Sequence, residues 1–376
     1  VIEGFAVPAE TAMTRRLVSA LAPAFATAAA LAFTLAPATA SIVVDGRTLP
    51  VVDMHLHAGD YATMAPGGKA FIASNLPPAF ALYAPELFDR LNDPYAPHVG
   101  IAAQTELAGV DQAVLFAVYT HHTTGYLTNE ALATMLLDAR NTTAGDEPWA
   151  FGFASINFDD WDSDVAGERL AALESYFVAH PGLFKGIKLA HAHQQVPFTD
   201  AAYQGVYQVA AEVGVPVLLH TGFSPFPGSV TDPAYYDPLG LEAVITTFDG
   251  THGAGRVEFI LSHVGQGDAR AVAHALDLAA AHDNVWLEIS ALGRPLSVGL
   301  DGQPVTSTEP QYPYVLAQIR ARGLISRTLF ASDGPQFSGS VRTYLQRMVA
   351  GMQAAGYTTD EIAAVLAGNV RRLLGD

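Results

Sequence analysis

The chain of 376 residues contains no cysteine. This absence excludes disulfide bonds, thiolate metal sites and a cysteine nucleophile, so only nitrogen and oxygen donors could hold a metal ion. Basic residues are scarce as well, with 19 Lys and Arg against 37 Asp and Glu and a net charge of -18. Nucleic acids and anionic membranes attract basic proteins, so we expect neither as a partner. The excess of acids is typical of a protein that stays in solution.

The rest of the composition is typical of a folded globular protein. Half of the residues are apolar and 15% are charged, which is typical of a globular protein with a large core. The length would allow two domains, but α/β barrels of this size commonly form one. We therefore expect residues 41–376 to form a single domain.

The first 40 residues have the features of an export signal. Met13 is the first methionine, so residues 1–12 are expected to be an upstream artefact. Two arginines then precede an uncharged apolar run, which ends in small residues before Ala40. This pattern predicts a signal peptide at 13–40, cleaved after Ala40, and a periplasmic or secreted protein without stable membrane association. An uncleaved membrane anchor is the alternative, and the arginine pair leaves both Sec and twin-arginine export open.

Beyond residue 40, short apolar segments alternate with amphipathic helical segments. After a short leading ribbon at 41–50, the predicted strands are 51–57, 112–119, 149–156, 184–190, 217–220, 257–265, 285–290 and 328–334. The predicted helices are 101–109, 129–140, 165–180, 200–213, 268–282, 339–354 and 359–374. Two loops rich in Pro and Tyr, 59–98 with short helices and 223–240, are expected to roof the pocket. Nearly continuous apolar strands joined by helices indicate buried parallel strands. Eight such units predict an α/β fold of the (β/α)8 TIM-barrel type, with an open doubly wound sheet as the alternative.

The positions of the histidines favour the barrel. Of 13 histidines, eight lie at or just after the carboxyl end of a predicted strand: His55, His57, His121, His122, His191, His193, His220 and His263. In a barrel these strand ends converge on one face, which is where active sites lie. An open sheet would spread the same side chains along a line.

The strand ends also supply a set of metal ligands. His55 and His57 are two residues apart on a predicted strand, so their side chains should share a face. With His220 and Asp333 they offer three imidazoles and a carboxylate, which suits one divalent metal ion: Zn²⁺ first, with Mn²⁺ or Fe²⁺ as alternatives. A metal-bound water becomes a nucleophile near neutral pH. Asp333 could then take its proton, and His263 could stabilise a developing oxyanion or orient the water.

Six segments together resemble a known family. They are VDMHLH (52–57), FKGIKL (184–189), PVLLHTG (216–222), FILSHVG (259–265), LFASDGP (329–335) and GNVRRLL (368–374). The chain from about residue 50 onward thus resembles the metal-dependent hydrolases of the amidohydrolase superfamily, in the branch that contains aminocarboxymuconate-semialdehyde decarboxylase. The resemblance implies one divalent metal held by the same four residues, with His263 contacting water or substrate. Members of the family often dimerise, so a homodimer is a further expectation.

Two residues inside the barrel have more than one interpretation. Lys188 lies where binuclear relatives carry a carboxylated lysine that bridges two metals, but single-metal relatives also have a lysine there. Glu288 could orient a ligand histidine or pair with Lys188.

Four further residues are candidates for contact with a substrate. His191 and His193 repeat the His-x-His spacing and are expected near the mouth as substrate contacts rather than as ligands. Arg294 could bind a substrate carboxylate with two hydrogen bonds, or lie on the surface. His121 could line the pocket or be an exposed loop residue.

Three functions are compatible with these residues. The first is a metal-dependent hydrolase that cleaves an amide, ester or lactone of a small organic molecule, which export slightly favours. The alternative is a lyase, a non-oxidative decarboxylase of an aromatic or unsaturated carboxylic acid. The third is a non-catalytic metal-binding or ligand-binding barrel, and the complete ligand set argues against it.

Overall fold

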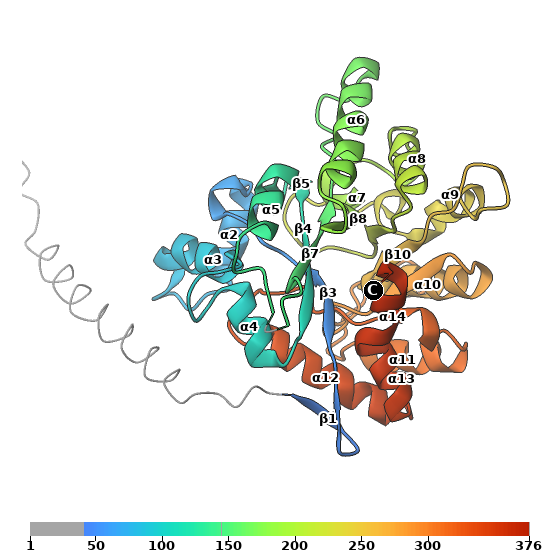
Figure 1. Ribbon diagram of the computed structural model, residues 1–376. Helices are drawn as coiled ribbons and strands as arrows, with labels where there is room; N and C mark the ends of the chain where they lie inside the picture. Colours follow the sequence, from blue (N-terminus) through green and yellow to red (C-terminus); the bar gives the residue numbers. More distant parts are fainter. Residues whose placement is uncertain (1–40, 144, 376) are drawn as a thin grey trace, which may run out of the picture. The chain divides into compact units, whose positions relative to one another are not determined.

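Figure 1 shows the computed structural model, which describes residues 41–143 and 145–375. The predicted upstream segment and signal peptide therefore lie outside the described residues. The described chain begins with an antiparallel hairpin of β1 (Ile42–Val44) and β2 (Arg47–Leu49), as the sequence predicts for a short leading ribbon. Residues 41–376 form one compact unit.

The centre of the fold is a sheet of eight parallel strands. Neighbouring strands in order are β3 (Val52–Leu56), β4 (Gln112–Phe116), β7 (Ala150–Ala154), β8 (Phe184–Leu189), β9 (Val217–His220), β10 (Phe259–Ser262), β11 (Val285–Glu288) and β12 (Thr328–Leu329). The first and last strands meet, because the backbone N–H of Met54 donates to the carbonyl of Phe330 at 3.2 Å and that of His57 to Gly334 at 2.8 Å. The sheet thus closes on itself. The predicted barrel is confirmed, and the open sheet is excluded.

Helices surround the strands (Figure 1). They are α4 (Ile101–Ala108), α5 (Asn129–Leu136), α6 (Ser163–Ala179), α8 (Ala202–Val213), α9 (Glu242–Thr247), α10 (Ala269–Ala281), α11 (Tyr312–Ala321), α12 (Ser340–Ala354), α13 (Thr359–Ala363) and α14 (Asn369–Leu374). Of these, α9 and α11 were not predicted. Within the described part of the chain, no helix is both long and apolar enough to cross a membrane.

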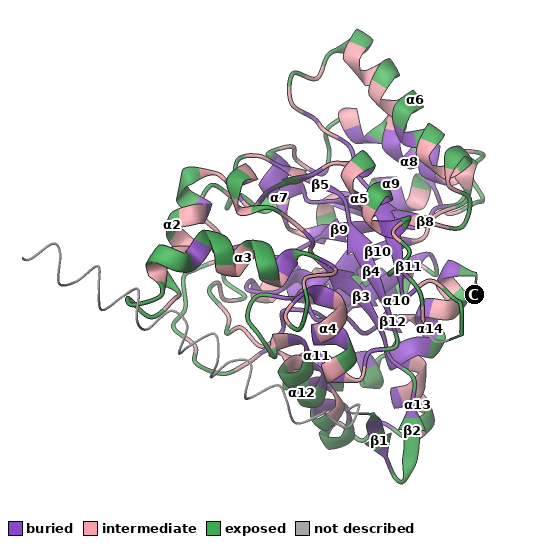
Figure 2. Cartoon of the chain, turned by 60° about the vertical axis from the view of Figure 1, so that its left-hand side comes forward, coloured by how far each residue is buried: buried purple, intermediate pink, exposed green. Residues whose placement is uncertain are grey.

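The apolar core has two layers, because alternate residues of a strand point to opposite faces. One layer lies between strands and helices, and the other fills the barrel. Figure 2 shows buried residues along the central strands. The inner layer includes Met54, Phe116 and Trp286, and it packs against Val370 of α14. Asn369 ties α14 to the start of β12, since its amide donates to the carbonyls of Ile325 and Thr328. One end of the barrel is therefore closed by the C-terminal helix.

The predicted long loop at 59–98 contains short helices, as expected: α2 (Pro66–Ser74) and α3 (Ala84–Asn92). The second predicted strand was too long. It ends at Phe116, and β5 (Val118–Thr120) turns back to pair with β6 (Gly125–Leu127).

The sixth and eighth predicted strands were also too long, because regular pairing stops at Ser262 and Leu329. Beyond these points the backbone turns, with left-handed φ angles of 64° at His263 and 59° at Asp333.

Candidate metal centre

The first histidine pair is placed by an irregularity in β3. Pairing with β4 shifts register between Asp53 and Leu56, and such a bulge re-aims side chains. Met54 packs in the inner layer of the core. The next side chain, His55, also meets that layer, with its ring 4.7 Å from the ring of Phe116. The bulge thus interrupts the regular alternation and turns His55 into the barrel mouth.

His55, His57 and Asp333 lie at the spacing of metal ligands. His55 Nε2 is 3.0 Å from His57 Nε2, and each of these nitrogens is 3.4 Å from Asp333 Oδ1. Ligand atoms that share one ion through bonds of about 2.1 Å lie roughly 3.0–3.4 Å apart in octahedral or tetrahedral geometry. The three side chains therefore fit a common ion without rearrangement of the backbone.

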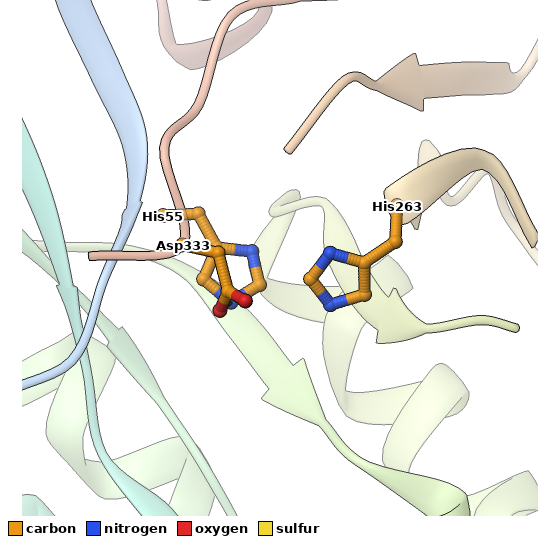
Figure 3. Close-up of side chains that lie close together, drawn as sticks. All are labelled: His55, His263 and Asp333. Atoms are coloured by element: carbon orange, nitrogen blue, oxygen red, sulfur yellow. Dashed lines mark ion pairs between the residues drawn. The ribbon is translucent and has the colours of Figure 1, made fainter. Parts of the chain in front are cut away.

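His263 and His220 lie beside this group. His55, His263 and Asp333 each offer a ligand atom within 4.8 Å of the other two, and Figure 3 shows the His263 ring facing the other two side chains. His220 Nδ1 is 3.1 Å from His263 Nε2. The other nitrogen of His220, Nε2, is buried and has no partner in the described part of the chain. Such a bare nitrogen is what a metal ligand provides, so the donor set fits a divalent ion.

Electrostatics favour neutral imidazoles and a charged carboxylate. Burial lowers the pKa of His55, His220 and His263 well below the ordinary histidine value, with further lowering by nearby positive charge. Burial opposes ionisation of Asp333, but the hydrogen bond from His57 and nearby positive charges outweigh it and lower its pKa. Neutral histidines with lone pairs and an ionised aspartate are the forms that bind a metal.

Glu288 contacts the ring nitrogen of His55 that does not face His57 and Asp333: its Oε2 lies 2.9 Å from His55 Nδ1. This contact corresponds to the orienting role considered from the sequence. Lys188 Nζ lies 3.5 Å from His55 Nε2 and 4.9 Å from the centre of the Phe116 ring. Burial lowers the pKa of Lys188 to about 8, against the charges of Glu288 and Asp333. A metal-bridging role for Lys188 stays a prediction.

Of the predicted substrate contacts, the structure brings His193 into the site, and Arg294 is near enough for its charge to act on residues there. His193 Nδ1 lies 2.9 Å from Thr123 Oγ1, and its ring meets His220 edge-on at 4.9 Å. Burial, with the charge of Lys188, lowers the pKa of His193 to about 3. The positive charge of Arg294 helps to lower the pKa of His193, of His263 and of Asp333.

The structure does not bring the other two into the cluster. The ring of His191 is fully buried between Phe198 and Tyr203, at centroid distances of 4.2 and 3.9 Å. Regular pairing of β8 ends before it, and the short helix α7 (His191–Gln194) turns its side chain away from that of His193. His121 Nδ1 pairs with Asp159 at 2.9 Å on a partly exposed loop.

Two supporting residues were missed in the sequence. Asp53 Oδ1 accepts hydrogen bonds from the backbone N–H groups of His55 at 3.2 Å and Ser332 at 2.9 Å, so it ties the two strands that close the barrel. Burial raises the pKa of Asp53 to about 7. Ser290 Oγ lies 2.7 Å from His263 Nδ1. A polar residue within an apolar strand was the available signal for Asp53, but nothing local marks Ser290.

Three residues at or next to the candidate metal site have strained backbone conformations. His263, Val264 and Asp333 all have positive φ angles, of 64°, 49° and 59°. Non-glycine residues in this region cost about 1–3 kcal/mol each and are concentrated at functional sites. These left-handed conformations turn the chain sharply after β10 and β12.

The sequence profile of the amidohydrolase family matches residues 52–375. The chain therefore belongs to the amidohydrolase family, and the resemblance carried by the six sequence segments is confirmed. Comparison with curated proteins gives no significant match.

Solved structures with the same fold have low sequence identity. An uncharacterised TIM-barrel protein from Bordetella bronchiseptica is 16% identical with a TM-score of 0.60, over 87% of this chain and 99% of its own. A 2,6-dihydroxybenzoate decarboxylase is 15% identical with a TM-score of 0.55, over 88% and 100%. A candidate 2-pyrone-4,6-dicarboxylic acid hydrolase from Pseudomonas putida is 18% identical with a TM-score of 0.50, over 88% and 98%. These similarities concern the fold.

Proposed function

We propose that this member of the amidohydrolase family is a metal-dependent, non-oxidative decarboxylase of a small aromatic or unsaturated carboxylic acid. The observation that carries the proposal is the placement of Arg294. Its charge reaches His193, His263 and Asp333, while its guanidinium makes no hydrogen bond or ion pair with any described residue. A partly buried guanidinium without a partner, beside a metal site, suits a substrate carboxylate.

The residues that would hold the ion are His55, His57, His220 and Asp333. A bound Zn²⁺ or Mn²⁺ would supply a Lewis acid that polarises substrate oxygens. Arg294 would orient the carboxylate, and the edge of Phe116 would border the space above the histidine pair.

The remaining requirement of the reaction is a proton. When the bond to the carboxylate breaks, carbon dioxide leaves and the electron pair stays on carbon, which must gain one proton. Asp333 and His263 lie within 4.8 Å of each other and can hold and pass that proton. A decarboxylase is also among the solved structures of this fold.

Hydrolysis is the second candidate, and a specific observation favours it. The lowered pKa of Asp333 keeps its carboxylate ionised, which is the form required of a base that activates water. One structure of the same fold is a candidate hydrolase of a dicarboxylic acid, so Arg294 would suit that reaction as well.

The two reactions leave different isotopes in the product. The mature chain, loaded with Zn²⁺ or Mn²⁺, is incubated with a panel of hydroxybenzoates and lactone carboxylates in D₂O and, separately, in H₂¹⁸O. Decarboxylation predicts released carbon dioxide and one deuterium on the carbon that lost it. Incorporation of ¹⁸O without carbon dioxide would contradict the decarboxylase and support hydrolysis.

We further propose that the enzyme acts outside the cytoplasm, because of the predicted signal peptide at 13–40. Expression of the full chain followed by cell fractionation and mass determination tests this proposal. Processed protein beginning at Ser41 in the periplasm or medium would support it, and full-length cytoplasmic protein would contradict it.

A further inference from the structure

The turn that carries Arg294 is ordered by its own backbone. The chain leaves β11 through Ala291, whose left-handed φ angle is 56°, and the backbone N–H of Arg294 donates to the Ala291 carbonyl at 3.2 Å. These contacts stay within the turn, so they do not hold it against the neighbouring loops of the barrel mouth. The place of Arg294 relative to the metal site therefore depends on contacts from other segments.

Gln311, the residue before α11, supplies such contacts with its side chain. Its Nε2 donates to the carbonyl of Arg294 at 2.8 Å and, over a longer distance, to that of Pro295 at 3.4 Å. Its Oε1 accepts from the backbone N–H of Gly267 at 3.1 Å. The residue is buried. One amide group thus joins the Arg294 turn to the segment that follows His263.

The same two segments also meet through their backbones. Gly267 lies four residues after His263, and its carbonyl accepts from the N–H groups of Ser297 and Val298 at 2.8 and 3.0 Å. Its φ angle of 82° lies in the region that glycine adopts readily. Because both the N–H and the carbonyl of Gly267 are used, the loop that begins at Arg294 has one register against the turn that carries His263.

Within this junction, Gln311 is the side chain that bonds to Arg294 itself. Gln311 occupies the N-cap position of α11, but its side chain makes no capping hydrogen bond to that helix. Its polar atoms are used on the Arg294 turn and on Gly267 instead. An arginine binds a carboxylate best when its backbone is held in place, since a misplacement of about 1 Å can cost about 100-fold and ordering a free side chain costs affinity.

We propose that Gln311 is a positioning residue for Arg294: its amide holds the backbone of Arg294 beside the turn of His263 and thereby gives the site its preference for a substrate carboxylate. The proposal rests on the role that the proposed function gives to Arg294. It is independent of whether the enzyme decarboxylates or hydrolyses.

Binding of benzoate and of benzamide, its uncharged analogue, tests the proposal in the chain loaded with Zn²⁺. Calorimetric titration of the unmodified chain should show tighter binding of benzoate. Gln311→Met keeps the length of the side chain but removes its hydrogen bonds. We expect it to weaken benzoate binding about tenfold and to leave benzamide binding unchanged.

The matched control is Gln112→Met. Gln112 is also buried, and its amide donates to the Pro148 carbonyl at the amino end of β4, away from the barrel mouth. This variant should change neither affinity.

A double-mutant cycle separates positioning from a general effect on the fold. In Arg294→Gln, benzoate should lose its advantage over benzamide, and the addition of Gln311→Met should then have no further effect. Unchanged benzoate binding in Gln311→Met, or a loss that persists in the Arg294→Gln background, would overturn the proposal and leave the role of Arg294 intact. A benzoate preference that is absent from the unmodified chain, or that survives in Arg294→Gln, would overturn the role of Arg294 and this proposal with it.

A crystal structure of the unmodified, metal-loaded chain with benzoate supplies a measurement that needs no variant. We expect the Arg294 guanidinium to contact the benzoate carboxylate while the Gln311 amide still bonds to the Arg294 carbonyl. Benzoate held by Arg294 with that hydrogen bond broken would overturn the proposal even if Gln311→Met failed to fold.

Discussion

Arg294 is the residue at which substrate binding can be separated from metal binding. Replacing it by glutamine should raise KM for a carboxylate substrate about 10–100-fold, because a charge-assisted hydrogen bond contributes about 1.5–3 kcal/mol. Metal content should be unchanged, since no predicted ligand is altered. Steady-state kinetics and metal analysis test this, with the exposed Arg322→Gln as control. An unchanged KM in Arg294→Gln would remove the main support for an acidic substrate.

Asp333 is predicted both to bind the metal ion and to carry a proton. Asp333→Asn keeps the size of the side chain but removes its charge and its basicity. We expect a folded protein whose turnover is at least about two orders of magnitude lower, as is typical for loss of an acid–base group. Circular dichroism would establish the fold and product assays the rate. Turnover close to that of the unmodified enzyme would rule out the proton role.

At the scale of elements, α2 lies directly against two loops at the barrel mouth. A Cβ on Gly68 would lie 2.6 Å from the backbone carbonyl of Thr123 and 3.0 Å from the Phe226 ring. Phe226 also meets Phe71 of α2 at 4.9 Å, and the Thr123 hydroxyl contacts His193. These contacts connect the predicted roof of the pocket to a predicted substrate contact.

Gly68→Ala should therefore weaken both the fold and the pocket. We expect a loss of about 1–3 kcal/mol, the usual cost of overpacking, and a higher KM because α2 must move. Gly167→Ala is the matched control, since a Cβ there meets nothing within 4 Å and the residue lies within α6. This control should gain about 0.5–1 kcal/mol. Thermal unfolding measures both changes, and similar shifts in the two variants would contradict the close packing of α2.

For the whole molecule, burial of histidine predicts a stability that depends on pH. Burial lowers the pKa of five histidines: His55, His191, His193, His220 and His263. Below about pH 6.5 these histidines bind protons in the unfolded chain but stay neutral in the folded chain. The free energy of unfolding therefore decreases by up to about 1.4 kcal/mol per pH unit for each group. Stability should therefore fall as the pH falls.

Two buried acids act in the opposite direction. Burial raises the pKa of Asp53 and Glu288, so their contribution to stability is present at low pH and is lost as the pH rises through the folded values. The five histidines outnumber them. We expect the urea midpoint of metal-free protein to decrease from pH 7.5 to 5.5. A constant or rising midpoint would show that these histidines are not buried in neutral form.

The order of the strands and the gathering of histidines at one end could be predicted from the sequence. Apolar runs of strand length alternate with helical periodicity, and both patterns depend on neighbours along the chain. His220 and His263 follow such runs directly, and parallel strands that close into a barrel necessarily bring their carboxyl ends together. Family membership followed from the same segments, which the sequence profile confirms.

Only the tertiary structure decided which of these side chains support one another. Glu288 on β11 contacts His55 on β3, with β12 between the two strands, and Ser290 contacts His263 at the end of the neighbouring β10. Asp53 contacts Ser332 where the barrel closes. These contacts depend on strand register and on bulges, which local periodicity does not encode. His191 and His193 share one motif, yet a single helical turn buries the first and leaves the second beside His220. The sequence by itself determined the barrel and its histidine-rich rim, and folding determined the spacing and partners within that rim because both arise from contacts between distant strands.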